Sequence, residues 1–460
     1  MAPAHIDRLD DAVGTGLERL VRAHHRRRLR RHGWARAYDP PADGSLWCVG
    51  DPPPRAGNAV EALVDGELAL GRLAADIAAA TESVHLAGWH FDPGFELVRD
   101  GPPLRALLAE TAERVDVRLL AWAGAPLPLF SPSRATVREQ REQLVRGTRV
   151  EMALDRMERP MHCHHEKLAV IDGRVAYVGG LDLTGLAGDR LDRSGHPPRP
   201  GIGWHDAALR IEGPLVVDVA AHLALRWRAV TEERLEASNR LLLAGGTAAQ
   251  FVRTVPNGVY DALPRGDFRI LESYVRALRS AERLVYLESQ FLWSSELVAI
   301  LAEKLRRPPS DDFHVVVLLP ARPNNGADDT RGQLGLLVAA DREKRFLACT
   351  LYQPHHGNQV YVHAKVGIVD DRWLSIGSAN LNEHSLFNDT ETCVITCDEQ
   401  VVRATRLALW REHLERDEPT FETWVERAHD DRYDRLRLLP HISRRTRRFL
   451  GPVNGLLVDG

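Results

Sequence analysis

The stretch HEKLAVID, residues 165–172, returns in the second half of the chain as HAKVGIVD, residues 363–370. Each copy begins with a histidine, has a lysine two residues further on, and ends with an aspartate. Only four of the 60 basic residues are lysines, and two of these four occupy the same place in the two copies. A single short motif often arises by chance, but a repeat of it within one chain rarely does. The sequence therefore carries a duplicated histidine–lysine–aspartate motif.

The sequence around the two motifs also repeats. Hydrophobic periodicity predicts a helix followed by two strands in each half. These elements are 68–80, 84–91 and 115–122 in the first half, and 270–281, 285–291 and 315–319 in the second. A long internal repeat indicates two copies of one domain, and strands that alternate with helices indicate an α/β fold with helices covering the sheets.

Composition divides the chain into three regions. Residues 1–58 are expected to form an N-terminal extension, helical at first, with the basic run HHRRRLRR at 24–31. Residues 59–245 and 246–460 are expected to be the two repeated domains, the second with a C-terminal tail. Two glycines interrupt a helical pattern in LLLAGGTAAQ (241–250), where we expect the domains to join.

Charge and targeting signals restrict the class of protein. The formal charge is −4 and the pI about 6.6, so no global basic field attracts nucleic acid, and no specific nucleic-acid partner is expected. The start of the chain lacks the pattern of a secretory signal, and no run of about 18 apolar residues follows. We therefore expect a cytoplasmic protein, with any membrane contact peripheral and at the inner face. The basic segments 24–31 and 442–450 are candidates for docking on anionic lipid, although such runs are more often solvated helix faces.

The motif residues point to displacement at a phosphodiester. A histidine and a lysine two apart on a strand face the same side, so both can contact one anion, and two copies supply two of each. A neutral imidazole can attack phosphorus while a second, protonated imidazole donates to the leaving oxygen. Lysines balance the charge on the other phosphate oxygens. The predicted catalytic set is His165, Lys167, Asp172, His363, Lys365 and Asp370, with each turn aspartate at the far end of its strand, where it holds local charges.

Supporting residues follow each motif. A carboxylate is needed to orient each histidine through its other ring nitrogen, and Asp206 and Glu391, or Asp389 in place of the latter, are the candidates. Asp182, Ser378 and Asn380 follow the second strands and are candidates for hydrogen bonds to the phosphate. No cofactor is expected.

A metal site is the alternative interpretation of the histidines near the first motif. MHCHH (161–165), together with His355 and His356, could form a metal cluster, but the spacing fits no standard zinc site. Adjacent residues on a strand also point in opposite directions. We therefore expect no metal there. The five cysteines have no disulfide or zinc spacing and are expected to be reduced.

The doubled motif, GGLDL (179–183), GSANLN (377–382) and YLESQF (286–291) resemble the phospholipase D superfamily, over residues 58–415. HHEKLAVIDGRVAYVGGLDLT (164–184) and WHDAALRIEGPLVVD (204–218) are most similar to phospholipid-acting phospholipases D and to phosphatidyltransferases such as cardiolipin synthases. The resemblance implies two pseudo-symmetric α/β/α sandwich domains, each with a mixed β-sheet, that share one active-site cleft in a monomer. It also implies a phosphohistidine intermediate without a metal, with His165 as nucleophile and His363 as acid. One departure is that the first half has Asp182 where the second has Asn380.

Three functional classes are consistent with these residues. The leading one is an enzyme that cleaves the head-group phosphodiester of a glycerophospholipid, or transfers the phosphatidyl group to an alcohol as cardiolipin synthases do. A nuclease is the second, and a non-catalytic phospholipid-binding protein the third. Trp89, Trp204 and Trp293 are candidates to line a lipid cleft, and Glu288 and Gln290 to contact it, although packing and a solvent-facing charge are the ordinary roles of such residues. The sequence leaves the head group, the acceptor and the direction of attack open.

Overall fold

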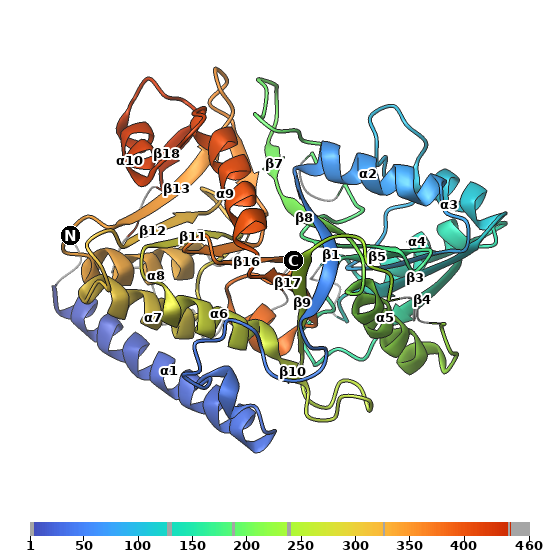
Figure 1. Cartoon of the computed structure of the whole chain (residues 1–460), viewed down its shortest axis with the longest axis horizontal. Coiled ribbons are helices and arrows are strands. Elements are labelled where there is room, and N and C mark those ends of the chain that lie inside the picture. The colour runs from blue at the N-terminus through green and yellow to red at the C-terminus, as the bar shows by residue number, and fades with distance from the viewer. Residues whose placement is uncertain are drawn as a thin grey trace.

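Two α/β halves lie side by side in the computed structural model, which describes residues 4–126, 131–185, 189–236, 241–324, 327–439 and 442. The first half runs from light blue to green in Figure 1, and the second from yellow to red. Strand β1, near the centre of the picture, passes between them. The two-domain α/β prediction is therefore confirmed.

The sheet of the first half has the strand order β4–β3–β2–β5–β6–β8–β1. Strands β2, β3 and β4 are parallel, and the other neighbours are antiparallel. The bounds are β1 Arg55–Val64, β2 Ser83–Gly88, β3 Asp116–Trp122, β4 Glu151–Asp155, β5 Leu168–Ile171, β6 Val175–Gly179 and β8 Ala207–Glu212. This is a mixed sheet with the first motif at β5.

The sheet of the second half repeats that order as β13–β12–β11–β15–β16–β17–β9, again with the first three strands parallel. Its strands are β9 Thr247–Val255, β11 Leu284–Glu288, β12 His314–Leu318, β13 Phe346–Tyr352, β15 Val366–Val369, β16 Trp373–Gly377 and β17 Glu391–Thr396. The short strands are β7 Gly203–His205, β10 Asp267–Phe268, β14 Gln359–Val362 and β18 Leu436–Leu438. The internal repeat is therefore a repeat of topology, with the second motif at β15.

Helices pack on the sheets through apolar stripes. In α2 the buried positions include Ala69, Leu70, Leu73 and Ile77, which lie on one face at helical spacing. The helices of the first half are α2 Gly66–Ala78, α3 Leu104–Ala112, α4 Arg134–Val145 and α5 Val216–Thr231. Those of the second are α6 Arg269–Ser280, α7 Ser295–Arg306, α8 Ala327–Ala340, α9 Glu399–Leu414 and α10 Phe421–His429. Two short helical turns are η1 Ala35–Ala37, in the N-terminal extension, and η2 His384–Asn388, in the second half.

The two halves share a hydrophobic core. Val178 and Leu209 of the first sheet belong to the same buried cluster as Phe251, Tyr286 and Ile376 of the second. The sheets are also joined through hydrogen bonds, because β1 pairs with β9 and β7 pairs with β14. The strands that carry the motifs are thus brought together from opposite halves.

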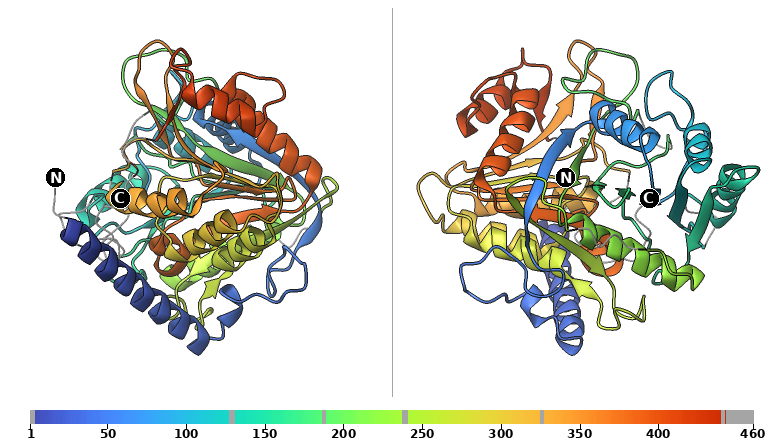
Figure 2. Two further views of the ribbon diagram at one scale, coloured as in Figure 1. Left: turned by 90° about the vertical axis from the view of Figure 1, so that its left-hand side faces the viewer. Right: turned by 45° about the vertical axis from the view of Figure 1, so that its right-hand side comes forward.

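Helix α1 (Ala4–Arg31) forms most of the N-terminal extension, as predicted. It lies along the second half, next to α7 (Figures 1 and 2). Part of the basic run faces the protein, since the Arg28 guanidinium donates to the Asn388 side chain at 2.9 Å and His25 stacks on Phe387. Within the described residues, no helix combines the length and the apolar character needed to cross a membrane. The second basic segment, 442–450, lies outside the described residues except for position 442.

The segment expected to join the halves, 241–250, begins without regular structure. Residues 241–246 are irregular, with Leu241, Leu242 and Leu243 exposed, and β9 begins at Thr247. The domain boundaries at 58/59 and 245/246 stay a prediction.

The turn aspartates of the two motifs have the same structural role. Asp172 accepts hydrogen bonds at 2.7–2.9 Å from backbone N–H groups of residues 81–83, just before β2. Asp370 accepts equivalent bonds at 2.7–2.8 Å from residues 282–284, before β11. Each aspartate therefore ties the start of one parallel strand to the end of the motif strand.

Replacement of Asp172 or Asp370 by Ala should lower the free energy of unfolding by about 1–3 kcal/mol, since several backbone donors lose their acceptor. Urea denaturation followed by circular dichroism measures this. The control is Asp261→Ala, which removes an exposed carboxylate. Equal stability of the Asp172, Asp370 and Asp261 variants would contradict the structural role.

Candidate active site

The two motifs meet at the interface between the halves. His165 and Lys167 directly precede β5, and His363 and Lys365 lie between β14 and β15, so the prediction that they lie within a strand was wrong by a few residues. In each copy the lysine ammonium donates to the backbone oxygen of its own histidine, at 2.9 Å for Lys167. Each ammonium therefore lies beside its histidine, as the prediction required. All four side chains are buried.

Each motif histidine is held by a carboxylate from the opposite half. His165 Nδ1 lies 3.0 Å from Glu391 Oε1, and His363 Nδ1 lies 2.7 Å from Asp206 Oδ2. The backbone repeats this exchange between the halves. The His165 N–H donates to the Thr390 oxygen at 2.9 Å, and the His363 N–H donates to the His205 oxygen at 2.8 Å. Neither half contains both members of a pair.

The two carboxylates are the orienting groups predicted from the sequence. Burial raises the pKa of Glu391, against the opposing effect of His165 and Lys167, and burial likewise raises the pKa of Asp206. A carboxylate that accepts the Nδ1–H group fixes the tautomer in which Nε2 carries the lone pair. Asp389, the alternative candidate, instead accepts from the N–H of Cys163 at 3.0 Å.

The serine and asparagine candidates bind protein groups. The Ser378 hydroxyl donates to Glu391 Oε2, so this serine acts on the orienting carboxylate. The Asn380 side-chain oxygen accepts from the Ser289 hydroxyl and the Gln290 N–H, both at 3.3 Å. In the first half Asp182 has a different environment, since its Oδ1 lies 3.4 Å from Lys167 Nζ. Because the first half has Asp182 where the second has Asn380, Lys167 has an acidic partner from this position.

Electrostatic coupling shows that the motif side chains lie close together. Burial would raise the pKa of Asp182, but Lys167, then Arg190 and the two motif histidines, lower it to about 2. Burial, with the positive charge of Lys167, lowers the pKa of Lys365 to about 7, although Asp206 opposes this. Lys167 thus affects both Asp182 and Lys365, and a bound phosphate would offset the repulsion between the two ammonium groups.

Arg190 is a component of the site that the sequence did not indicate. Its guanidinium stacks over Trp204, 3.4 Å from the ring centroid, and its Nη1 lies 3.4 Å from His363 Nδ1. Burial, followed by Lys365 and Arg190, lowers the pKa of His363 well below its usual value, so His363 is neutral in the free protein. No periodic pattern or motif marks this arginine, which lies in an irregular segment between β6 and β7.

Apolar groups border the site. The ring centroids of Trp89 and His165 are 6.3 Å apart, and those of Trp204 and His363 are 4.8 Å apart. Trp293 lies 6.4 Å from His384 instead. A cavity of about 50 Å³ also adjoins the site, and its lining is Lys167 and Asp182 together with apolar side chains that include Leu70, Leu73, Leu86 and Phe91.

Two further candidates have other roles than expected. Glu288 is fully buried and binds His205 Nε2 at 2.8 Å, so it neither contacts the motif histidines nor faces water. The Gln290 amide donates to the Tyr361 hydroxyl at 2.7 Å. Asp172 and Asp370, predicted with the catalytic set, lie at the far ends of β5 and β15.

The histidines considered for a metal cluster are separated in the structure. His164 Nε2 lies 3.0 Å from Asp155, whereas His165 binds Glu391. His355 is exposed beside Asp434, and His356 is also exposed. His162 lies instead with His384 and Asp389, whose ligand atoms are within 4.8 Å of its own. The histidines of 161–165, His355 and His356 therefore do not form one cluster.

Comparisons with known proteins agree with the motifs. A family profile described as "Cardiolipin synthase, PLD-like domain" matches residues 274–411. Phospholipase D alpha 4 of Arabidopsis thaliana is 24% identical over 73% of this chain and 62% of the plant protein. Phospholipase D A of Dictyostelium discoideum is also 24% identical, over 73% of this chain but only 34% of its own length. The chain thus spans less than two thirds of these two relatives.

A bacterial relative and a solved structure extend the comparison. The major cardiolipin synthase ClsA of Bacillus subtilis is 25% identical over 80% of this chain and 72% of its own length. The crystal structure of phosphatidylserine synthase from Haemophilus influenzae Rd KW20 shares the fold, with a TM-score of 0.50 and 12% identity over 77% of this chain and 84% of that chain. These matches show that the chain is similar in sequence to phospholipases D and cardiolipin synthases, and that it shares its fold with the phosphatidylserine synthase.

Proposed function

We propose that the protein cleaves the head-group phosphodiester of a glycerophospholipid through a covalent phosphohistidine. The observation that carries this proposal is the crosswise pairing, in which His165 binds Glu391 and His363 binds Asp206. Each imidazole then presents Nε2 for nucleophilic or acid–base work beside a lysine. The pair is matched in geometry, and the mechanism gives its two members opposite proton requirements.

In the first step, Nε2 of neutral His165 attacks phosphorus, and the bond from phosphorus to the head-group oxygen breaks. His363 gives its Nε2 proton to that oxygen. The free protein holds His363 neutral, and a bound phosphate anion would offset Lys365 and Arg190, the charges that lower its pKa. Binding of the diester therefore favours protonation of His363 by solvent, against burial, which is the largest cause of its lowered pKa.

In the second step, His363 takes a proton from the acceptor hydroxyl, whose oxygen attacks phosphorus and breaks the bond to His165. Water as acceptor gives phosphatidic acid, and an alcohol gives a new phospholipid. Lys167 and Lys365 balance the charge on the phosphate oxygens in both steps. Cardiolipin synthase-like transfer is thus a variant of the same mechanism with a phospholipid alcohol as acceptor.

A lipid substrate is favoured over nucleic acid. The relatives are named phospholipases D and cardiolipin synthases. The indoles beside both histidines offer apolar surface to the glycerol moiety of a lipid. A formal charge of −4 supplies no general attraction for a polyanion. A nuclease is the second candidate, and a non-catalytic lipid-binding role would leave two complete motifs without a purpose.

The setting of the reaction follows from the same features. We propose a monomer, because the internal repeat supplies both halves of the site. We also propose a cytoplasmic location with peripheral contact at the membrane. Arg27, Arg30 and Arg31 of α1 are exposed and available for such contact, whereas Arg28 is engaged inside the protein.

The substrate class can be tested with one panel. Purified protein is offered a labelled phosphatidylcholine or phosphatidylglycerol in vesicles, with and without a primary alcohol, and separately a labelled DNA strand. Phosphatidic acid in water and a phosphatidyl alcohol in its presence are the expected products. Cleavage of DNA alone would replace the lipid proposal by the nuclease, and binding to vesicles without turnover would favour the non-catalytic role.

Replacement of His165 or His363 by Ala should lower kcat by at least about 100-fold, because each removes a nucleophile or a proton donor. Lys167→Arg and Lys365→Arg should lower it by about 10-fold or more, since a planar guanidinium does not replace a compact ammonium. Steady-state kinetics on the preferred lipid measure both effects. His355→Ala and Lys344→Arg, at exposed positions, are the matched controls. Turnover of the motif variants at the level of these controls would contradict the mechanism.

Replacement of Arg190 by Gln should move the acid-side limb of the kcat/KM profile to higher pH. We assign that limb to His363, whose pKa is lowered first by burial and then by Lys365 and Arg190, so loss of the guanidinium removes one cause of this lowering. Arg193→Gln, an exposed position in the same segment, is the control and should leave the limb in place. An unchanged limb in the Arg190 variant, or a shift to lower pH, would show that Arg190 does not set the titration of His363.

A further inference from the structure

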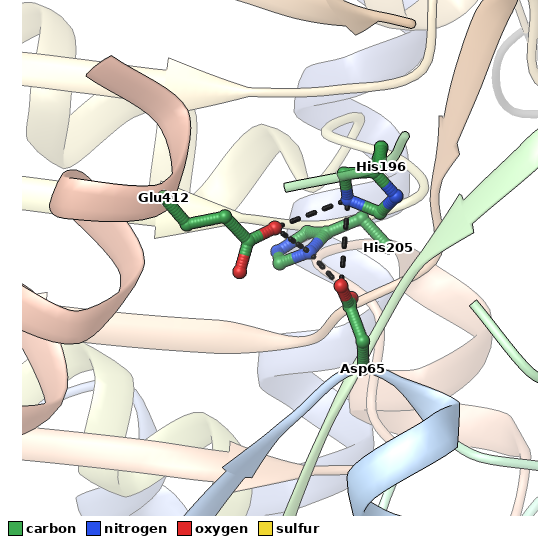
Figure 3. A group of neighbouring side chains, drawn as sticks. All are labelled: Asp65, His196, His205 and Glu412. Carbon is green, nitrogen blue, oxygen red and sulfur yellow. Dashed lines mark hydrogen bonds and ion pairs between the residues drawn. The ribbon is translucent and has the colours of Figure 1, made fainter. Parts of the chain in front are cut away.

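A second cluster of titratable side chains lies behind the active site. Asp65, His196, His205 and Glu412 point toward one common centre (Figure 3). Their side chains are at most 5% exposed. Asp65 precedes α2, His196 lies in the segment before β7, His205 is in β7, and Glu412 is in the last turn of α9. The cluster therefore joins three residues of the first half to one of the second.

The distances between the donor atoms suit a tetrahedral metal ion. His196 Nε2 lies 3.5 Å from Asp65 Oδ2 and 3.1 Å from Glu412 Oε1. His205 Nδ1 lies 2.9 Å from Asp65 Oδ1 and 3.7 Å from Glu412 Oε1. A tetrahedron with bonds of about 2.0–2.1 Å to zinc has edges of about 3.3 Å. With Asp65 Oδ2 as the ligand atom, three separations are 3.1, 3.5 and 3.7 Å, and all four donor atoms lie within 4.8 Å of one another.

Several of these atoms have no hydrogen-bond partner. Among the described residues, none forms a hydrogen bond of acceptable geometry with Asp65 Oδ2, His196 Nε2 or Glu412 Oε1. Buried polar atoms without partners are rare in native proteins, and a bound ion is one of the ordinary explanations. Three of the four side chains thus direct an unpartnered atom at the centre of the cluster.

A carboxylate lies beside the other ring nitrogen of both histidines, with a hydrogen bond at His205 and an ion-pair contact without hydrogen-bond geometry at His196. Glu288 Oε2 lies 2.8 Å from His205 Nε2, and Asp192 Oδ2 lies 3.4 Å from His196 Nδ1. Metal-binding histidines nearly always have such a partner, because it fixes the tautomer and raises the basicity of the ligand nitrogen. Glu288 is itself held by the Tyr286 hydroxyl. This role accounts for a buried glutamate that the phosphodiester mechanism does not use.

Another buried polar network of the chain is balanced differently. Arg226 lies fully buried between Asp155 and Glu166 and forms an ion pair with each, at 2.8 and 2.7 Å. In the described part of the chain, no lysine or arginine forms an ion pair with Asp65 or Glu412. Buried carboxylates need a cation, and here only the histidines or a metal ion can supply it.

We propose that Asp65, His196, His205 and Glu412 bind one divalent transition-metal ion, for which zinc is the best match. Two imidazoles and two carboxylate oxygens at tetrahedral spacing suit zinc, whereas calcium and magnesium take six or more oxygen ligands. Four protein ligands leave no open position, so the ion is structural and not the site of the phosphodiester reaction. A divalent ion also supplies the charge that two imidazolium protons would otherwise carry.

The ion would fix the segment that supports His363. The His205 backbone oxygen accepts from the His363 N–H at 2.8 Å, and the Asp65 N–H donates to the Asp206 oxygen at 2.8 Å. Both residues of the His363–Asp206 pair are therefore bonded to the backbone of a metal ligand. Through Glu412 the ion would also connect α9 of the second half to this segment.

Metal analysis of the full-length protein tests the proposal without reference to its activity. The wild-type chain, purified without chelator from cells grown with zinc, is expected to hold about one equivalent of zinc by mass spectrometry of the elements. The double variant His196→Asn, Glu412→Gln should hold none at this site. His85→Asn is the matched control, since His85 is a buried histidine with a single carboxylate partner, Asp116, at 3.2 Å. It should retain the full equivalent.

Thermal unfolding supplies a second readout. Wild-type protein stripped of metal should unfold at a temperature several degrees lower and should recover on addition of zinc chloride, because an ion that binds only the folded state stabilises it. The double variant should not respond. If the double variant fails to fold, X-ray absorption at the zinc edge of the wild-type protein should show four nitrogen or oxygen neighbours, two of them imidazole.

Three results would overturn the proposal. A wild-type protein that contains no transition metal and binds none from added zinc would mean that the cluster holds protons alone. Equal metal content in the wild-type and double-variant proteins would place the ion elsewhere. A sulfur ligand at the zinc edge would assign the ion to a cysteine instead of this cluster.

Discussion

The structure depends on the requirement that each motif imidazole be held, inside the protein, by a carboxylate from the other half. Placing these charged groups out of water is costly unless each has a partner. His165 therefore needs Glu391 of β17, and His363 needs Asp206 of the segment before β8. These two contacts, with the shared core between the sheets, fix the relative position of the halves. One half alone would leave a buried histidine without its acceptor and a buried carboxylate without its donor.

Pseudo-symmetry supplies two similar sets of groups, and the differences between them divide the roles. Lys167 has Asp182 as an acidic partner, whereas the matching asparagine in the second half binds backbone and side chains of its own half. Arg190 Nη1 lies 3.4 Å from His363 Nδ1. Among the described residues, no arginine makes the matching contact with His165. In the mechanism that we propose, a phosphate that enters this site meets one histidine whose pKa depends on the charge of the ligand. That dependence would allow two similar imidazoles to act as nucleophile and acid.

Much of this was open to prediction from the sequence, and the reason for each failure is physical. The duplicated motif, the α/β repeat, and the carboxylates Asp206 and Glu391 could be predicted because local spacing or a repeated pattern marks them. The crossing of the carboxylates could not, since His165 and Glu391 are 226 positions apart and nothing local distinguishes a partner in the same half from one in the other. Arg190 and the Asp65 cluster were missed for the same reason, because their members come from separate segments.

In the proposed mechanism the two motifs make one site, and one histidine carries the phosphoryl group. The most direct measurement is a rapid quench of the reaction with a labelled phospholipid under neutral denaturing conditions, followed by peptide mapping by mass spectrometry. The account predicts at most one labelled histidine per chain, on the peptide that contains His165. Label on both motif histidines of one chain would indicate two independent sites, and label on His363 alone would reverse the roles. A reaction that turns over with no labelled histidine would contradict covalent catalysis.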